Sequence, residues 1–370
     1  MEQESYKSQI IISGEDCITG IADILKQNEK KSVLVVTSES SVQRYGGDFL
    51  RNYNGRKTFF YGFSSNPKYE EVEEGLKVFQ QAGCDAVLSV GGGSAIDVAK
   101  NIKAFFGMDS EKNFFEQKKE PNEILHIAVP TTAGTGSESS CFSVVYYKGE
   151  KKSVEDPSML PDYAVLCPVF LKSLSFYQKK ATVMDALCQG IESYWSVNAT
   201  AESRRYAKMA IQGMLTYIWD YLEQSSSLDK IMWSANYAGR AINISKTTAA
   251  HAMSYKITSM YQFAHGHAVG ICLPVTWRHM NGYLKTHTEG YGSLMSLLQE
   301  LSIIMGCTDT EDAVAAFEDV LKKMQMEYPT RKSDTDIQIL AESVNVERLN
   351  NFPIPVSKAE LKTMYEQIVR

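Results

Sequence analysis

The sequence has few of the features that mark membrane, secreted or nucleic-acid-binding proteins. No stretch approaches the run of about 18 apolar residues that a membrane span needs, and the N-terminus shows no signal-peptide pattern. The seven cysteines are scattered and form no Cys-x-x-Cys pair, which favours reduced thiols over a disulfide framework. The net charge of −6 offers no basic footprint for nucleic acid or an anionic membrane. We therefore expect a cytoplasmic protein whose partner is a small molecule.

Histidine is also scarce, with six in 370 residues, yet His251, His265 and His267 fall within one short segment. Neutral imidazole is the commonest side-chain metal ligand and titrates near neutrality. Any one of these residues, taken alone, is better explained as a structural histidine. Their concentration in an apolar, helix-compatible stretch favours a metal or catalytic site over 251–274.

The first half of the chain alternates short apolar runs with amphipathic ones. The chain length favours two domains. Buried strands are predicted where β-branched and apolar residues run together, at 32–37, 57–61, 86–90, 126–130 and 164–167. A helix is predicted over 69–81 and a β-hairpin over 142–152. This pattern predicts an N-terminal α/β domain, residues 1–171, with a parallel sheet covered by helices.

Two turns rich in glycine and hydroxyl residues follow the strands at 86–90 and 126–130. A flexible linker is the alternative for the glycine run, but an apolar strand and a helix-forming stretch enclose it. Turns of this kind let backbone N–H groups approach phosphate, and both would lie at the carboxyl edge of the sheet. A dinucleotide is the natural ligand, although neither Gly-x-Gly-x-x-Gly nor the Walker pattern is present. The expected cofactor-binding residues here are Gly91, Gly92, Gly93, Ser94, Asp97, Thr131, Thr132, Thr135 and Ser137.

The second half, residues 172–370, is predicted to be all helical because long stretches of 3.6-residue period dominate it. The expected helices are 179–196, 201–223, 228–244, 250–261, 284–305, 310–324, 335–343 and 358–369. On the first of them Asp185 and Gln189 are four residues apart, so both project from one face. With two imidazoles they could enclose a divalent ion. Alternatively, Asp185 pairs locally and Gln189 is a polar core residue.

Together, the two turns, the Asp185 helix and the His-x13-His-Gly arrangement resemble the iron-containing alcohol dehydrogenases along essentially the whole chain. The resemblance implies a Rossmann-like NAD(P)-binding domain, a helical domain and a metal between them, the fold shared with dehydroquinate synthase. Family members often form dimers. The family's metal ligands fall on Asp185, position 189, His251 and His265. Position 189 holds Gln where the family has His, which implies a weaker ligand or none.

The residues around these positions resemble the phosphonoacetaldehyde reductase branch of the family, in which phosphonoacetaldehyde becomes 2-hydroxyethylphosphonate during phosphonate biosynthesis. The resemblance implies that Fe²⁺ or Zn²⁺ polarises the aldehyde oxygen and that the nicotinamide supplies hydride. Lys246 and Lys256 flank His251 and could present ammonium groups to the phosphonate. For each lysine, a solvated helix face is the alternative. Tyr255 stands where many relatives have a second His; it or the extra His267 could relay the proton. His267 could instead orient the metal loop.

Cofactor preference depends on the residue after the first strand, where an acidic side chain would bind the 2′-hydroxyl and repel a 2′-phosphate. That residue is Ser38, which favours NADPH over NADH, although Glu39 is adjacent. Three other functions stay open. They are a general short-chain aldehyde reductase, a lyase of the dehydroquinate-synthase type, and a non-catalytic protein that has lost the metal.

Overall fold

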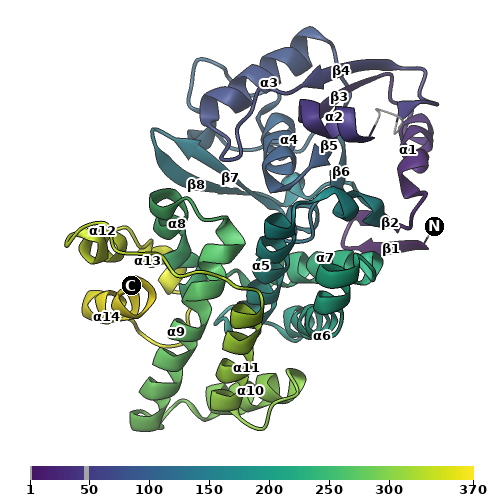
Figure 1. The fold of residues 1–370 in the computed structure, drawn as a ribbon. Coiled ribbons are helices and arrows are strands. Elements are labelled where there is room, and N and C mark those ends of the chain that lie inside the picture. Colours follow the sequence, from purple (N-terminus) through teal and green to yellow (C-terminus); the bar gives the residue numbers. More distant parts are fainter. Residues whose placement is uncertain (1, 46–49) are drawn as a thin grey trace. The chain divides into compact units, whose positions relative to one another are not determined.

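The computed structural model describes residues 2–45 and 50–370, and the chain divides into two compact units, Met1–Leu174 and Ser175–Arg370 (Figure 1). The first unit is α/β and the second is helical. This order confirms the predicted fold class. Within the described residues, no helix combines the length and apolar character that crossing a bilayer would require.

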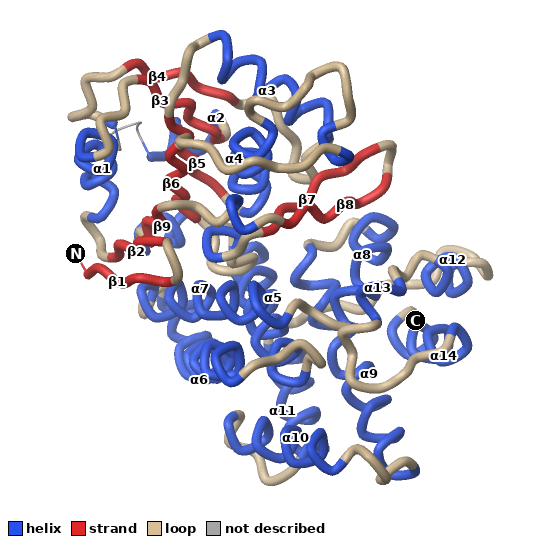
Figure 2. Tube along the Cα trace, turned by 180° about the vertical axis from the view of Figure 1, so that it is seen from behind, coloured by secondary structure: helices blue, strands red, loops and turns tan. Residues whose placement is uncertain are grey.

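The first unit is built on a sheet that, over the described residues, has seven strands in the order β1-β2-β9-β6-β5-β3-β4 (Figure 2). The strands pair in parallel except β1 with β2. Their bounds are β1 Glu2–Tyr6, β2 Gln9–Ser13, β3 Ser32–Thr37, β4 Arg56–Phe60, β5 Ala86–Gly91, β6 Leu125–Pro130 and β9 Tyr163–Leu166. The separate hairpin is β7 Phe142–Tyr147 with β8 Glu150–Glu155.

Helices cover both faces of this sheet, which is why its central strands are mostly apolar. The buried Ser89 of β5 and His126 of β6 are exceptions, and their side chains hydrogen-bond each other. Along β3, Leu34 and Val36 join the core formed with α3 (Tyr69–Gln81) and α4 (Gly93–Phe105). Val33 and Val35 join the opposite core, with α1 (Ile21–Gln27). Alternate side chains of a strand point to opposite faces, so a strand with two covered faces has apolar residues at most positions.

The strands and the helix α3 were predicted to within one residue at most ends, but β1, β2 and α1 were not predicted. β2 owes its place to parallel pairing with β9, more than 150 residues later, as in Ile10 with Tyr163. β1 is a polar edge strand, and in the described part of the sheet its one neighbour is β2. A pairing partner so distant in sequence leaves no local pattern to detect.

The second unit is helical, with longer connections at 324–335 and 350–357. Their bounds are α5 Phe176–Trp195, α6 Ala201–Gln224, α7 Leu228–Ser245, α8 Ala249–Tyr261, α9 His265–Thr286, α10 Gly292–Ile304, α11 Thr310–Lys323, α12 Asp336–Glu342, α13 Val346–Leu349 and α14 Lys358–Ile368. The predicted helix over 284–305 is wrong. It joins the end of α9 to α10 across a turn in which Gly290 has φ +81°, a conformation that interrupts a helix. Pro274 lies inside α9 rather than ending it.

Candidate functional site

Three of the four expected metal ligands meet in the second unit. Asp185 comes from α5, His251 from the first turn of α8 and His265 from the start of α9. One potential ligand atom from each residue lies within 4.8 Å of the others. His251 Nε2 is 3.3 Å from an oxygen of Asp185, and both residues are buried. Residues 66 and 80 positions apart from Asp185 in the chain thus converge at one point.

Glu192 holds His251 in place and was not assigned a role from the sequence. It is buried on α5, and one carboxylate oxygen hydrogen-bonds His251 Nδ1. The other oxygen accepts from the backbone N–H groups of Thr248 and Ala250, at 3.1 and 2.9 Å, and from the Thr248 hydroxyl at 2.6 Å. Glu192 therefore caps the N-terminus of α8 and directs His251 Nε2 towards Asp185.

The electrostatics of this cluster favour positive charge. Burial by itself would lower the pKa of His251, but Glu192 and Asp185 outweigh it and raise that pKa to about 9. Burial would likewise raise the pKa of Asp185, yet the hydrogen bond to His251 and the charge of His265 keep it below its usual value. Asp185 Oδ1 and His251 Nε2 are both buried and lie 3.3 Å apart, so two candidate ligand atoms face each other. A carboxylate and two imidazoles form a donor set that suits Fe²⁺ or Zn²⁺, so these residues fit the implied metal.

Gln189, the fourth expected ligand, lies one helical turn beyond Asp185 and is 3% exposed. Its side chain hydrogen-bonds that of Asp185, which contributes to the lowered pKa of the carboxyl group. This position is compatible with two roles. Gln189 either donates its oxygen to the ion or fixes the carboxylate that does so.

Gly266 brings α9 against α5 at the metal cluster. A Cβ atom built there would lie 2.0 Å from the carbonyl oxygen of Ala181 and 2.7 Å from the Cβ of Asp185. Only glycine permits this approach, and it sets the neighbouring His265 beside Asp185. The His-Gly pair singled out in the sequence therefore has a steric reason.

His267 has both ring nitrogens hydrogen-bonded to protein groups. Nε2 lies 2.8 Å from the carbonyl oxygen of Glu327, and Nδ1 lies 3.0 Å from the hydroxyl of Tyr177, which also accepts from the N–H of Ala264. Burial lowers the pKa of His267, consistent with a neutral ring that donates through Nε2 and accepts at Nδ1. Of the two roles left open by the sequence, this geometry favours fixing the loop before His265 over relaying a proton.

Tyr255 lies against the metal cluster, whereas the two lysines differ in position. The Tyr255 ring stacks on His265 with centroids 5.7 Å apart, and burial raises its pKa while the Arg348 guanidinium opposes the rise. Lys256 follows His251 by five residues on α8, which puts the two side chains about 140° apart around the helix. Lys246 precedes α8 and is half-buried, with φ +63°. Arg348 is a nearby cation that the sequence reading missed.

In the first unit the two glycine-containing turns lie against each other. The N–H of Thr131 donates to the carbonyl oxygen of Gly91 at 2.9 Å. A Cβ at Gly93 would lie 3.0 Å from Thr135 and 3.2 Å from Ser137, and one at Gly92 would lie 3.5 Å from Thr132. Gly92 is the N-cap of α4, so the free N–H groups of that helix open at this point. The sequence placed both turns at the carboxyl edge of parallel strands, and β5 and β6 end there.

The remaining expected cofactor residues hydrogen-bond other groups of the first unit. The Ser38 hydroxyl accepts from the N–H of Ser41 at 3.1 Å, at the start of α2 (Glu39–Tyr45). The Ser94 hydroxyl donates to the carbonyl oxygen of Ser65. Asp97 is buried and accepts from the N–H of Val144 on β7, and burial raises its pKa to about 6. That bond ties α4 to the hairpin, a structural task that the sequence did not indicate.

The comparisons with known proteins agree with this geometry. The iron-containing alcohol dehydrogenase model matches residues 8–168, and the model of the family's C-terminal domain matches residues 179–369. A phosphonoacetaldehyde reductase of Streptomyces viridochromogenes is 30% identical over 247 residues, which is 62% of either chain. A 4-hydroxybutyrate dehydrogenase of Clostridium kluyveri is 29% identical over 86% of this chain and 89% of that protein.

The fold is also that of solved structures. A sulfoacetaldehyde reductase of Bifidobacterium kashiwanohense, crystallised with NAD⁺, superposes with a TM-score of 0.89 at 25% identity, over 100% of this chain and 99% of that one. An iron-containing alcohol dehydrogenase of Thermococcus thioreducens gives a TM-score of 0.87 at 22% identity, with 99% of each chain covered. The family models between them span nearly the whole sequence. The chain belongs to the iron-containing alcohol dehydrogenase family and is an oxidoreductase.

Proposed function

We propose that this chain is a metal-dependent NAD(P)H-linked reductase that converts phosphonoacetaldehyde to 2-hydroxyethylphosphonate. The observation that carries the proposal is the buried cluster of Asp185, His251 and His265, with Glu192 behind His251. The substrate rests on two relatives, named for reducing phosphonoacetaldehyde and sulfoacetaldehyde. Both names describe acetaldehyde that carries a tetrahedral anionic group, which points to one class of substrate.

Each residue of the cluster has a proposed task in this reaction. A bound nicotinamide would supply the hydride and a bound divalent ion the Lewis acid that polarises the aldehyde oxygen. Asp185, His251 and His265 would hold the ion, and Gln189 would either complete the set or fix Asp185. Tyr255, which stacks on the candidate ligand His265, is the proposed residue for passing a proton through water, and His267, which bonds Glu327 and Tyr177, is proposed to fix the loop before His265.

The phosphonate needs cations near the metal cluster. Lys246 precedes the helix that carries His251, and Arg348 is close enough to Tyr255 to influence its pKa. We propose these two as the anion-binding residues, ahead of Lys256, whose helical position turns it away from His251. Removing one charged partner from the anion typically weakens binding by about tenfold or more.

For the cofactor, we propose that NADPH is preferred, with the two turns at Gly91–Gly93 and 131–137 binding the pyrophosphate. Ser38 at the end of β3 carries no charge that would repel a 2′-phosphate. The substitution Ser38→Asp should raise the KM for NADPH far more than that for NADH. Equal effects on both would remove this assignment. A homodimer, which the family resemblance favours, is checked by light scattering of the purified protein.

The experiment compares phosphonoacetaldehyde with butyraldehyde in metal-replete protein, with NADPH and NADH oxidation as the signal. We expect kcat/KM to favour the phosphonate by about 100-fold, which corresponds to about 2.7 kcal/mol. Lys246→Gln and Arg348→Gln should raise KM for the phosphonate alone. Lys208→Gln, on the exposed side of α6, is the control and should leave the KM for both aldehydes unchanged.

A general short-chain aldehyde reductase is the second candidate. The relatives named 4-hydroxybutyrate dehydrogenase and NAD-dependent methanol dehydrogenase favour it, because their substrates differ in size and charge. Equal kcat/KM values for the two aldehydes would support this function in place of the first.

A further inference from the structure

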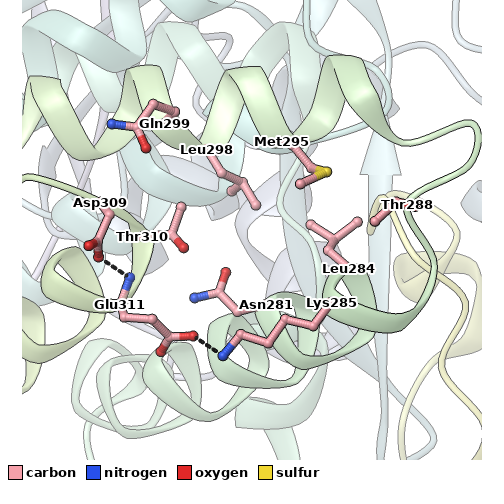
Figure 3. A pocket seen from close by; sticks show the side chains of 10 residues that line it. All are labelled: Asn281, Leu284, Lys285, Thr288, Met295, Leu298, Gln299, Asp309, Thr310 and Glu311. Atoms are coloured by element: carbon pink, nitrogen blue, oxygen red, sulfur yellow. Dashed lines mark hydrogen bonds and ion pairs between the residues drawn. The ribbon is translucent and has the colours of Figure 1, made fainter.

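A pocket of about 350 Å³ lies between α9, α10 and α11, at the end of α9 remote from the metal cluster (Figure 3). Asn281 lies about 24 Å along α9 from His265, at the helical rise of 1.5 Å per residue. The pocket is therefore distinct from the candidate metal site. A volume of this size is at the lower end of those that hold small ligands, roughly 300–1,000 Å³.

Asn281 is the polar group that gives the pocket its chemistry. Its side chain is directed into the middle of the pocket (Figure 3), and the residue is only 5% exposed. Both its Nδ2 and Oδ1 atoms are buried and, over the described residues, have no hydrogen-bond partner. Buried amides are normally paired, because an unpaired donor or acceptor loses its bonds to water without replacement. This side chain thus offers a donor and an acceptor together.

The charged groups at the pocket are matched within the protein. Lys285 pairs with Glu311 at 2.9 Å. Asp309 caps α11 by accepting from the N–H groups of Glu311 and Asp312, each at 2.9 Å. These residues therefore offer no unpaired opposite charge to an ion in the pocket. The carboxylates of Asp309 and Glu311 would also repel an anion.

Apolar side chains make up much of the remaining lining, beside the polar Thr288, Gln299 and Thr310. Leu284 and Leu298 are 4% and 1% exposed, and Met295, at 43% exposed, leaves the side open to solvent. An aliphatic chain would remove this surface from water. We propose that the pocket binds an uncharged aliphatic molecule whose end group both donates and accepts a hydrogen bond, namely a carboxamide or a primary alcohol, with that group paired to Asn281.

The test uses the full chain and titrates hexanamide, 1-hexanol and hexanoate by calorimetry and ligand-observed NMR. We expect saturable binding of the amide and the alcohol, with hexanoate at least about tenfold weaker because its carboxylate repels Asp309 and Glu311. Asn281→Leu removes both proposed hydrogen bonds to the ligand at similar side-chain volume and should weaken hexanamide binding by about 30-fold. Gln299→Leu is the matched control, since that exposed amide lines the same pocket but donates to the carbonyl oxygen of Thr308. Its affinity for hexanamide should stay within about threefold of the wild-type affinity.

Three results would overturn the proposal. The first is the absence of saturable binding to the wild type. The second is that the wild type binds hexanoate as tightly as hexanamide, and the third is that Asn281→Leu binds hexanamide as tightly as the wild type does. A thermal melt checks that Asn281→Leu folds. We expect no loss of stability, since the substitution removes no side-chain hydrogen bond to any residue that the structure describes. Met295→Trp gives a second test that spares the core, because its indole would fill the open side of the pocket and compete with the ligand. Binding is measured without the reduction reaction, so its outcome does not depend on the proposed function.

Discussion

Glu192→Gln replaces one buried oxygen by an amide nitrogen and should weaken metal binding at the candidate site without removing any candidate ligand. The carboxylate accepts from His251 Nδ1 on one oxygen and from Thr248 and Ala250 on the other. An amide can keep the second set, but its NH₂ group then faces His251 Nδ1. The imidazole must present a lone pair there, so its proton moves to Nε2, the atom that faces Asp185. A protonated Nε2 cannot ligate a metal ion.

The expected loss in metal affinity is about 10- to 100-fold, the usual effect of changing a residue that orients a metal ligand, or about 1.4–2.7 kcal/mol. Calorimetric titration of chelator-treated protein with Zn²⁺ measures it, and the melting temperature without metal verifies folding. Glu202→Gln, at an exposed position at the start of α6, is the control and should bind the ion as the wild type does. Unchanged affinity in Glu192→Gln would refute the orienting role.

Three further predictions concern the helical unit. Gln189→His should raise Zn²⁺ affinity by about tenfold, because imidazole is a better donor to late first-row ions; no change would mean that position 189 does not reach the ion. Gly266→Ala forces a Cβ to within 2.0 Å of the Ala181 carbonyl oxygen and should lower both melting temperature and Zn²⁺ affinity, whereas Gly282→Ala on the same helix meets no atom within 4 Å and should be neutral. Asp336→Asn should lower the melting temperature at pH 7. Hydrogen bonds, of which that from Ser333 has the largest effect, lower the Asp336 pKa from 3.8 to about 2. The resulting stabilisation is therefore present above about pH 4 and is lost as the pH falls through 2. A difference in melting temperature between variant and wild type that does not narrow over this pH range would contradict the prediction.

The sequence revealed the sheet core because burial on both faces leaves a continuous apolar run, as in Val33–Val36 of β3. It also indicated the two glycine turns, because parallel strands bring their carboxyl ends together. It did not reveal β2, whose pairing with β9 is a long-range event. Nor did it reveal the break between α9 and α10, where the surrounding periodicity concealed the turn at Gly290.

At the site, the spacing of polar residues along α5 also indicates a role for Glu192. Asp185, Gln189 and Glu192 follow the i, i+4, i+7 pattern of one helical face, so a third polar residue on that face could have been assigned with the first two. The hydrogen bonds of His267 and the proximity of Arg348 to Tyr255 depend instead on segments distant in the chain. The periodicity of one helix cannot identify such partners.

The central claim is that Asp185, His251 and His265 form a metal site, and the most direct test is the metal content of the protein. Wild-type chain loaded with Fe²⁺ or Zn²⁺ and passed through gel filtration should retain one ion per chain by elemental analysis, and His265→Ala should retain almost none while its melting temperature without metal stays close to that of the wild type. A wild type that retains no ion, or a variant that retains it fully, would contradict the account.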